Sequence, residues 1–461
     1  MNWKQLLNPN RPRPSSMGAD HREQFERDYD RAIFSTPVKR LQDKAQVFPL
    51  EPHDAVRTRL THSLEVSAVA RGLAISVGKW LLEEKHIEPG MERQIEAIAG
   101  TCGLIHDLGN PPFGHAGEDA IRGWFKKRGE AKLREELKGD EQRVQDLLQF
   151  EGNAQTLRLV SKLQLLADFN GLNLTFGTLS AACKYVAASN EANKDHHDHA
   201  RTKPGFFSSE NDLIKKIREQ TGTGNARNPI TFLVEGADDV VYSVADIEDG
   251  IKKGIISWKE VEDILLEGGK ADTSGTAAKV LALKDTILKA GRDSVPMNLS
   301  NDVHGSAFRT ASISVLVSDA VATFKKHYAD IMAGTYHGEL VGDGDCKAYV
   351  ETLKKIGRSR IYCTHSTLKL ELMGRAIIHD LLDLYWEGAE KLATDGTVQT
   401  KNFAGRAGAL LSPNYREVFC HFALADAGGN DRYHRYLLVT DQVCGMTDTF
   451  AKRLHAELNN G

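Results

Sequence analysis

The chain has 461 residues, of which 41% are hydrophobic, so it is long enough to bury a large core or to form more than one domain. Its 59 Lys and Arg residues nearly balance its 63 Asp and Glu residues, and the formal net charge of −4 argues against a protein that coats nucleic acid along its whole surface. The 6 cysteines are scattered without a Cys-x-x-Cys pair, which favours reduced thiols in a cytoplasmic protein over a disulfide framework or a zinc knuckle.

The sequence predicts no membrane-spanning segment. The first residues lack the apolar core of a signal peptide. The most apolar stretch, residues 313–324, is too short to cross a bilayer and is interrupted by Ser314, Ser318 and Asp319.

Helix-like spacing of apolar residues dominates the chain, and strand-like alternation is scarce. We expect an all-α fold that forms one large domain with helical insertions. The expected helices lie at 21–33, within 35–50 (a short helix before a turn at Pro49), at 57–81, 92–108 and 124–147 (Lys- and Glu-rich, read as a solvated excursion), from 151 onward, near 184–185 with an end at 188–190, and at 233–250, 308–324, 349–396 and 436–458. A short strand is expected within 420–430.

The segment 103–118 concentrates the polar chemistry of the sequence. His106 and Asp107 end an apolar helix-like run, and Gly109 and two prolines then stop the helix. His115 and Glu118 follow, and a helix starting near His115 would place both on one face. A structural helix end followed by an ordinary loop is the alternative interpretation.

Two other helices offer candidate ligands. His62 follows Arg57 and Arg59 near a helix start, where a lone histidine is most often a surface or core residue, but guanidinium groups at this place suit phosphate oxygens. Asp238, Tyr242 and Asp246 repeat every four residues and form one polar face on an otherwise apolar helix. That face could equally be solvated or turned toward a cation.

The run His196-His197-Asp198-His199 resembles a metal cluster, but adjacent residues of a loop rarely converge on one ion. We therefore expect a solvated loop. The alternative is that the run lines a substrate entrance together with Lys203.

His62, His106, Asp107 and Asp238 together supply two imidazoles and two carboxylates from three separate helices. Such a donor set suits Mn, Fe, Co, Ni, Zn or Mg in the divalent state, with positions left for water and substrate oxygens. A metal that polarises a phosphoryl oxygen and lowers the pKa of water serves hydrolysis at phosphorus.

The pattern His…His-Asp…Asp resembles the HD-domain phosphohydrolase superfamily. More specific sequence motifs surround it, and they resemble motifs of the bacterial deoxyguanosine triphosphate triphosphohydrolases (dGTPases) and, more broadly, of the dNTP triphosphohydrolases. These motifs are residues 40–50 (RLQDKAQVFPL), 57–63 (RTRLTHS), 106–118 (HDLGNPPFGHAGE), 150–155 (FEGNAQ), 237–243 (ADDVVYS) and 441–451 (DQVCGMTDTFA). The resemblance covers nearly the whole chain and is weakest over 265–410.

The resemblance implies an HD-domain helical bundle within a single dGTPase-like domain over 1–461, with a core at 50–260 that carries the metal site and a mostly helical C-terminal extension at 265–461. It implies His62, His106, Asp107 and Asp238 as ligands of a divalent metal, Mn²⁺ or Mg²⁺ before Fe, Co, Ni or Zn. It implies His115 and Glu118 as the catalytic pair. The substrate contacts that it implies are Gln46, Val47, Arg59, Lys184, Tyr185, Lys203, Tyr242 and Asp246.

The activity that the resemblance implies is hydrolysis of dGTP, or of dNTPs generally, at the α-phosphorus. A metal-activated water attacks, and the products are a deoxynucleoside and inorganic tripolyphosphate. The resemblance also implies a homo-oligomer such as a hexamer, and it allows single-stranded DNA or a nucleotide as effector. The alternatives are another HD-type nucleotide phosphohydrolase, or a nucleotide- or single-stranded-DNA-binding regulator.

Overall fold

The computed structural model describes residues 1–14, 21–51, 53–164, 168–268, 274–291, 299–426 and 430–460. Over these residues the regular secondary structure is helical except for one small parallel sheet, in which β1 (Ala187–Ala188) pairs with β2 (Pro204–Phe206). The expected all-α fold is confirmed.

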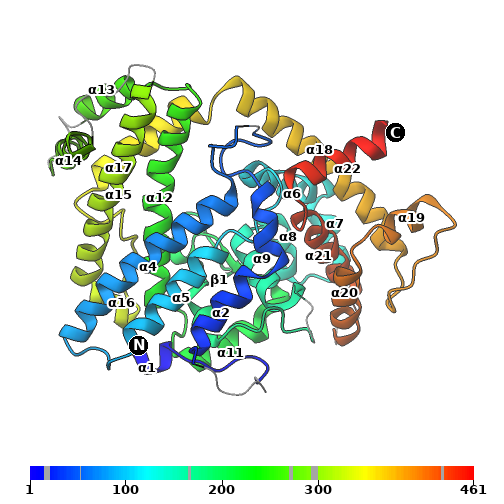
Figure 1. The fold of residues 1–461 in the computed structure, drawn as a ribbon. Coiled ribbons are helices and arrows are strands. Elements are labelled where there is room, and N and C mark those ends of the chain that lie inside the picture. Colours follow the sequence, from blue (N-terminus) through cyan, green and yellow to red (C-terminus); the bar gives the residue numbers. More distant parts are fainter. Residues whose placement is uncertain are drawn as a thin grey trace.

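Three long helices form the centre of the molecule, α4 (Arg59–Glu83), α5 (Met91–Ile105) and α12 (Pro229–Lys252). They lie side by side in Figure 1. Side chains at helical spacing, such as Val66, Leu73 and Val77, are fully buried on α4, as the apolar stripe predicts. Shorter helices surround this centre: α1 (Trp3–Leu6), α2 (Gln24–Ile33), α3 (Thr36–Arg40), α9 (Gly152–Arg158), α10 (Phe176–Ala181) and α11 (Asn211–Thr221), with 3-10 turns at 41–43, 199–201 and 208–210 and a π-helical turn at 159–163.

One side of the molecule is built from the middle of the chain (Figure 1, yellow-green). Its helices are α13 (Trp258–Gly268), α14 (Thr276–Gly291), α15 (Ser300–Lys326), α16 (Tyr328–Ala333) and α17 (Lys347–Ile356), followed by a π-helical turn at 357–361. By length and composition α15 meets the criteria for a membrane span, but half of its most apolar window is buried in the fold, and the helix packs against α12, α14 and α4.

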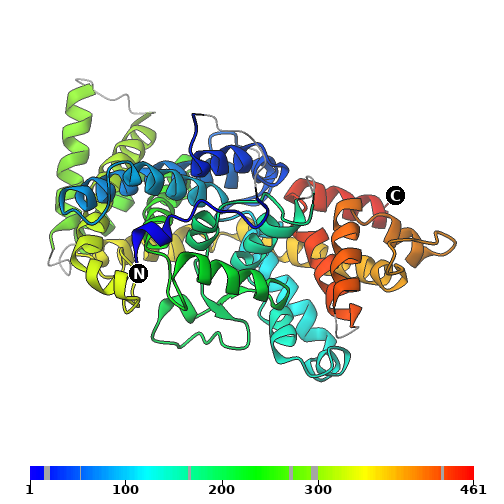
Figure 2. The ribbon, with the colours of Figure 1, turned by 90° about the horizontal axis from the view of Figure 1, so that it is seen from below.

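On the opposite side of the molecule, the C-terminal helices lie near helices that follow α5 in the chain (Figure 2). α6 (Gly114–Arg128) packs against α18 (His365–Lys391), which also contacts α21 (Asp431–Cys444) and α22 (Asp448–Asn460). The remaining helices here are α7 (Glu130–Glu136), α8 (Glu141–Leu148), α19 (Phe403–Ala409) and α20 (Pro413–Ala425).

Several local expectations were wrong. The strand expected within 420–430 is helical as far as Ala425, because Tyr415, Val418 and Phe419 bury one face of α20; residues 427–429 lie outside the described part of the chain. The closing helix is two helices, α21 and α22, with a break after Cys444.

The charged excursion at 124–147 is also less solvated than predicted. Leu133, Leu137, Val144 and Leu147 of this stretch are buried in the core beside Trp124. Most of the charged residues cover the outer face, but Asp146 is buried and accepts hydrogen bonds from the Ser189 and Tyr433 hydroxyls. The helix expected to end at 188–190 ends instead at Ala181, and residues 187–188 form β1.

Candidate metal and catalytic site

A cavity of about 330 Å³ lies where α4, α5, α6 and α12 meet. Most of the residues singled out in the sequence line it: Gln46, Arg59, His106, Asp107, His115, Glu118, Lys184, Tyr185, Lys203, Asp238 and Tyr242. His62, Val47 and Asp246 are not among the lining residues. The fold therefore brings together groups that are far apart in the sequence.

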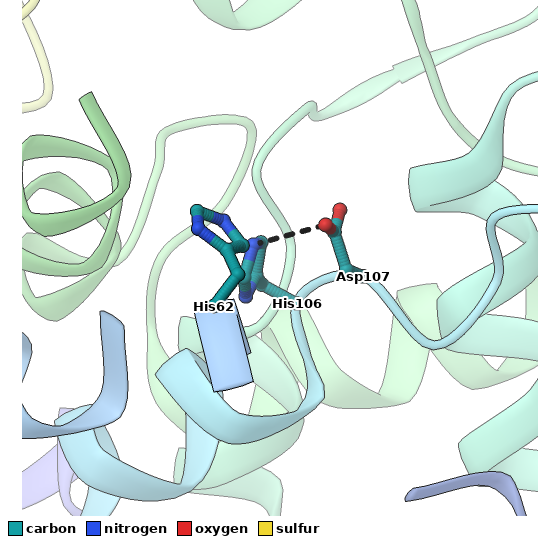
Figure 3. Close-up of side chains that lie close together, drawn as sticks. All are labelled: His62, His106 and Asp107. Carbon is teal, nitrogen blue, oxygen red and sulfur yellow. Dashed lines mark ion pairs between the residues drawn. The ribbon is translucent and has the colours of Figure 1, made fainter. Parts of the chain in front are cut away.

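The four candidate metal ligands come from three helices at one end of this cavity. His62 lies in the first turn of α4, whereas His106 and Asp107 directly follow α5, and Asp238 lies on α12. His62 Nε2 is 3.1 Å from Asp238 Oδ1, and His106 Nε2 is 3.4 Å from Asp107 Oδ2 and 3.6 Å from Asp238 Oδ1. Figure 3 shows His62, His106 and Asp107 close together, with the His106–Asp107 ion pair dashed.

Close packing of α4 on α5 sets the distance between the two histidines. A Cβ atom added to Gly103 would lie 2.7 Å from Ser67 Cα, so no larger residue fits at this crossing. Ser67 Oγ donates to the Gly100 carbonyl at 2.7 Å, and the rings of His62 and His106 meet edge to face with centroids 5.3 Å apart.

The donor set fits a divalent metal. His106 Nδ1 bonds the Gly103 carbonyl at 2.8 Å, but His106 Nε2 is buried and has no hydrogen-bond partner among the described residues. Burial lowers the pKa of His106, but the carboxylates of Asp107 and Asp238 outweigh it and raise that pKa to about 9. The site thus attracts positive charge and offers a nitrogen without a hydrogen-bond partner, next to oxygen donors.

The choice between the two adjacent aspartates has a geometric basis. Asp238 Oδ1 lies within 3.6 Å of a nitrogen of each histidine. Asp239 instead lies 3.7 Å from Lys354 Nζ on α17, and burial raises the pKa of Asp239 to about 7. Asp238 is the carboxylate placed to serve as a ligand.

The second candidate pair, His115 and Glu118, lies in the first two turns of α6. His115 Nδ1 is 2.9 Å from Glu118 Oε2, and the Gly152 N–H donates to Glu118 Oε1 at 2.8 Å. Glu118 is buried, whereas His115 exposes 85% of its side chain. The hydrogen bond to Glu118 raises the pKa of His115. Burial favours protonation of Glu118, but the bond from His115 outweighs it and lowers the pKa of Glu118.

Two glycines, Gly109 and Gly152, lie where the motifs at 106–118 and 150–155 contact each other, and the packing there requires glycine. A Cβ atom on Gly109 would lie 2.2 Å from the Gly152 carbonyl oxygen, and one on Gly152 would lie 2.1 Å from Asn110 Oδ1. Residues 106–118 and 150–155 therefore touch backbone to backbone, and only glycine permits the approach that buries Glu118.

Three cations reach the cavity. The Arg59 guanidinium forms an ion pair with Asp107. Lys184 Nζ is 3.7 Å from Glu235 Oε1 and 3.8 Å from Asp238 Oδ2, and Lys203 Nζ is 3.3 Å from Glu151 Oε2. Burial lowers the pKa of Lys184 and of Lys203, but neighbouring acidic groups outweigh it and raise both pKa values, so both lysines stay charged.

The residues expected near the sugar divide into two groups. Gln46 and Tyr242 line the cavity, and Gln46 Oε1 is a buried acceptor without a hydrogen-bond partner among the described residues. Asp246 is buried behind Tyr242 on the same helix and accepts a 2.6 Å hydrogen bond from the Tyr362 hydroxyl, while Val47 packs at the edge of a hydrophobic cluster.

Sequence reasoning missed several residues of this site. Tyr362, whose ring stacks with that of Tyr242 at a centroid distance of 6.4 Å, follows the π-helical turn in the region where the resemblance is weakest. Glu151 and Asn153 also line the cavity. The sequence motif at 150–155 contains both residues and could have identified them.

The histidine run does not behave as a simple solvated loop. His199 is half-buried, with Nε2 3.1 Å from Glu339 Oε1 and Nδ1 3.6 Å from Glu235 Oε1. The alternative was that residues 196–199 line a substrate entrance together with Lys203. Lys203 does line the cavity, but no residue of 196–199 does.

The comparisons with known proteins agree with this geometry. The HD domain family matches residues 59–162, a stretch that contains His62, His106, Asp107, His115 and Glu118. The chain is therefore an HD-domain protein, and an HD domain implies a divalent metal.

Relatives match over the full length of the chain. A deoxyguanosinetriphosphate triphosphohydrolase-like protein of Listeria innocua is 37% identical over 100% of this chain and 99% of its own length. The deoxyguanosinetriphosphate triphosphohydrolase of Klebsiella pneumoniae (strain 342) is 32% identical over 93% of this chain and 92% of its own length. A similarly named "-like" protein of Synechocystis is 31% identical over 99% of both chains. The chain belongs to the deoxyguanosinetriphosphate triphosphohydrolase family and is a hydrolase of the HD type.

Proposed function

We propose that this protein hydrolyses dGTP, or dNTPs generally, at the α-phosphorus and releases a deoxynucleoside and inorganic tripolyphosphate. The observation that carries the proposal is the convergence of three groups on one cavity of about 330 Å³. A four-residue metal donor set, a His–Glu pair and three cationic side chains are what such a reaction requires. The printed names of the relatives favour dGTP as the first substrate to test.

The metal would be held by His62, His106, Asp107 and Asp238, and Mn²⁺ or Mg²⁺ is the ion we expect. A divalent ion there supplies Lewis-acid charge beside the phosphoryl group under attack. The rest of the reaction depends on groups that belong to the chain itself.

His115 is the group placed to move a proton. Glu118 engages Nδ1 and fixes the ring, which leaves Nε2 as the other nitrogen. The exposed ring can protonate the departing 5′-oxygen in its charged form or accept a proton from water in its neutral form. The hydrogen bond to Glu118 raises the pKa of His115 and so favours its charged form.

Arg59, Lys184 and Lys203 are placed to bind the triphosphate, because charge-assisted hydrogen bonds to phosphate are strong and cationic side chains supply them. Glu235 and Glu151 pair with Lys184 and Lys203, respectively, at the cavity wall. Tyr185 packs beneath Lys203, whose Nζ lies 5.7 Å from the tyrosine ring centroid.

Gln46 and Tyr242 are placed to contact the deoxyribose. The unpartnered Gln46 Oε1 can accept a hydrogen bond from a sugar hydroxyl, which would relieve the cost of burying it. We propose that Tyr242 fits closely against the 2′-carbon and so excludes ribonucleotides.

A product assay tests the proposal. Purified protein with Mn²⁺ is given each of the four dNTPs and GTP separately, and the products are resolved by ion-exchange chromatography. Deoxynucleoside plus tripolyphosphate, abolished by a chelator, is the expected result. Monophosphate plus pyrophosphate would mean that a different bond breaks, and no turnover with any nucleotide, alone or mixed, would favour a binding protein.

A further inference from the structure

The turn that leads into His115 has an unusual backbone. Phe113 has φ of 62° and Gly114 has φ of 57°, so two consecutive residues are left-handed. A bulky residue such as phenylalanine rarely adopts this conformation unless its surroundings impose it. The groups that hold Phe113 therefore also determine where α6 begins and where His115 points.

One of these groups is a carboxylate from the far end of the chain. Asp448, in the first turn of α22, is buried and accepts the Phe113 N–H at Oδ1 (2.9 Å). Its other oxygen, Oδ2, accepts the Ala45 N–H at 3.0 Å. Thr447 Oγ1 accepts the Phe450 N–H at 3.3 Å and so caps the helix itself, which leaves Asp448 to bridge two distant loops.

Neighbouring contacts continue the same bridge. Lys44 Nζ donates to the carbonyls of Asn110 (2.6 Å) and Cys444 (2.7 Å), so it joins the same three segments. Arg59 Nε donates to the Ala45 carbonyl at 3.1 Å.

The ring of Phe113 is held by the same side of the molecule. A Cβ atom on Gly374 of α18 would lie 2.6 Å from Phe113 Cγ, so the ring packs directly on the α18 backbone. The C-terminal helices therefore hold both the backbone and the side chain of this residue.

We propose that Asp448 is a positioning residue of the active site. Its carboxylate ties the segment that carries Gln46 to the turn that aims His115, and so keeps the sugar-contacting and proton-transferring groups in register. The proposal rests on the proposed function only for the roles of Gln46 and His115, and the bridge itself can be tested without any substrate.

The chemistry of the bridge requires two acceptors. Asp448→Asn has the same shape but offers one acceptor oxygen and one amide group that is itself a donor. It can therefore satisfy only one of the two N–H groups. Because the metal ligands are held by α4, α5 and α12, we expect the variant to bind Mn²⁺ within about threefold of wild type while kcat falls on the order of 10- to 100-fold, more than KM changes.

The experiment measures hydrogen exchange by mass spectrometry on the full-length protein, in peptides that cover 41–48 and 108–118, alongside kcat, KM and thermal unfolding. The matched control is Asp441→Asn. Asp441 is also a buried C-terminal carboxylate, but it bonds Arg158 and Gln155 instead of the two loops. We expect Asp448→Asn to speed exchange in both peptides and lower kcat, and Asp441→Asn to lower the unfolding temperature without this pairing of effects.

Normal kcat and exchange in folded Asp448→Asn would overturn the proposal, and so would the same local changes in Asp441→Asn. If Asp448→Asn does not fold, Asp448→Ser is measured in the same way, because it leaves room for a water between the two N–H groups. Rapid exchange of both amides in the wild type would also overturn the bridge. A wild type that is inactive on every nucleotide but shows the expected exchange would instead count against the proposed function.

Discussion

Within the described part of the chain, two groups of side chains have the spacing of a metal site, and they differ in the hydrogen bonds that their histidine nitrogens make. His62, His106 and Asp107 form one group, and His199, Glu235 and Glu339 form the other. His106 Nε2 has no hydrogen-bond partner among the described residues. Both nitrogens of His199 are engaged, because Nδ1 lies 3.2 Å from the Arg227 guanidinium and Nε2 faces Glu339.

The surrounding charge differs as well. Arg227 forms a buried ion pair with Glu235 at 2.5 Å, and Lys184 lies 3.7 Å from the same carboxylate. The charge of Glu235 is therefore already balanced by the protein. The comparison shows that the spacing of donors does not by itself define a metal site: Arg227 engages both His199 and Glu235, whereas His106 Nε2 of the first group has no hydrogen-bond partner among the described residues.

The largest expected effect is on the first group. Asp238→Ala removes a carboxylate that is shared by both histidines, so Mn²⁺ affinity should fall by more than about 100-fold, beyond the loss typical of an outer partner, and turnover should be lost. Calorimetric titration and the product assay measure both. Asp239→Ala is the control and should keep Mn²⁺ affinity near that of wild type. If Asp238→Ala still binds the ion tightly while Asp239→Ala does not, Asp239 is the ligand.

The next effect separates chemistry from metal binding. His115→Ala removes the proton-transferring group but no metal donor, so turnover should fall about 10²- to 10⁴-fold with Mn²⁺ affinity retained. The same two measurements check it. Near-normal turnover in this variant would contradict the role of His115.

A smaller effect concerns the pH dependence. The Glu118 carboxylate stabilises the charged form of His115, so Glu118→Gln should lower the pKa of His115 toward its ordinary value of about 6.5. The limb of the profile of kcat/KM against pH that reports His115 should then move to lower pH, whether His115 acts as acid or base. An unmoved profile would show that another group sets that limb.

The smallest expected effect is on the second group. Glu339→Gln should leave Mn²⁺ stoichiometry at one ion per chain, because His199 and Glu235 are satisfied by Arg227. Metal analysis after equilibrium dialysis measures the stoichiometry. A loss of one bound ion in this variant would make the second group a site after all.

Much of the site could be predicted because its residues sit on regular helices. The 3.6-residue period predicted the buried stripe of α4 and the polar face of α12, and Gly109 marked the end of the run that carries His106 and Asp107. The oligomeric state, the effectors, the cellular compartment and the division at residue 265 stay predictions.

Other features depend on partners that no local pattern reveals. The charged composition of 124–147 hid a buried face, and Tyr362 reaches Tyr242 from more than a hundred residues away in sequence. Asp448 is part of the sequence motif at 441–451, but nothing in that motif shows that its carboxylate accepts hydrogen bonds from the Phe113 and Ala45 N–H groups.

The sequence by itself determined the helical class, the family, and the kinds of side chain from which the site is built, because helix periodicity and motif spacing are local properties of the chain. Only the tertiary structure decided which donors converge and which are satisfied elsewhere. Hydrogen bonds and ion pairs between distant segments, such as Arg227 with Glu235 or Asp448 with Phe113, form only when packing brings the partners within about 3 Å.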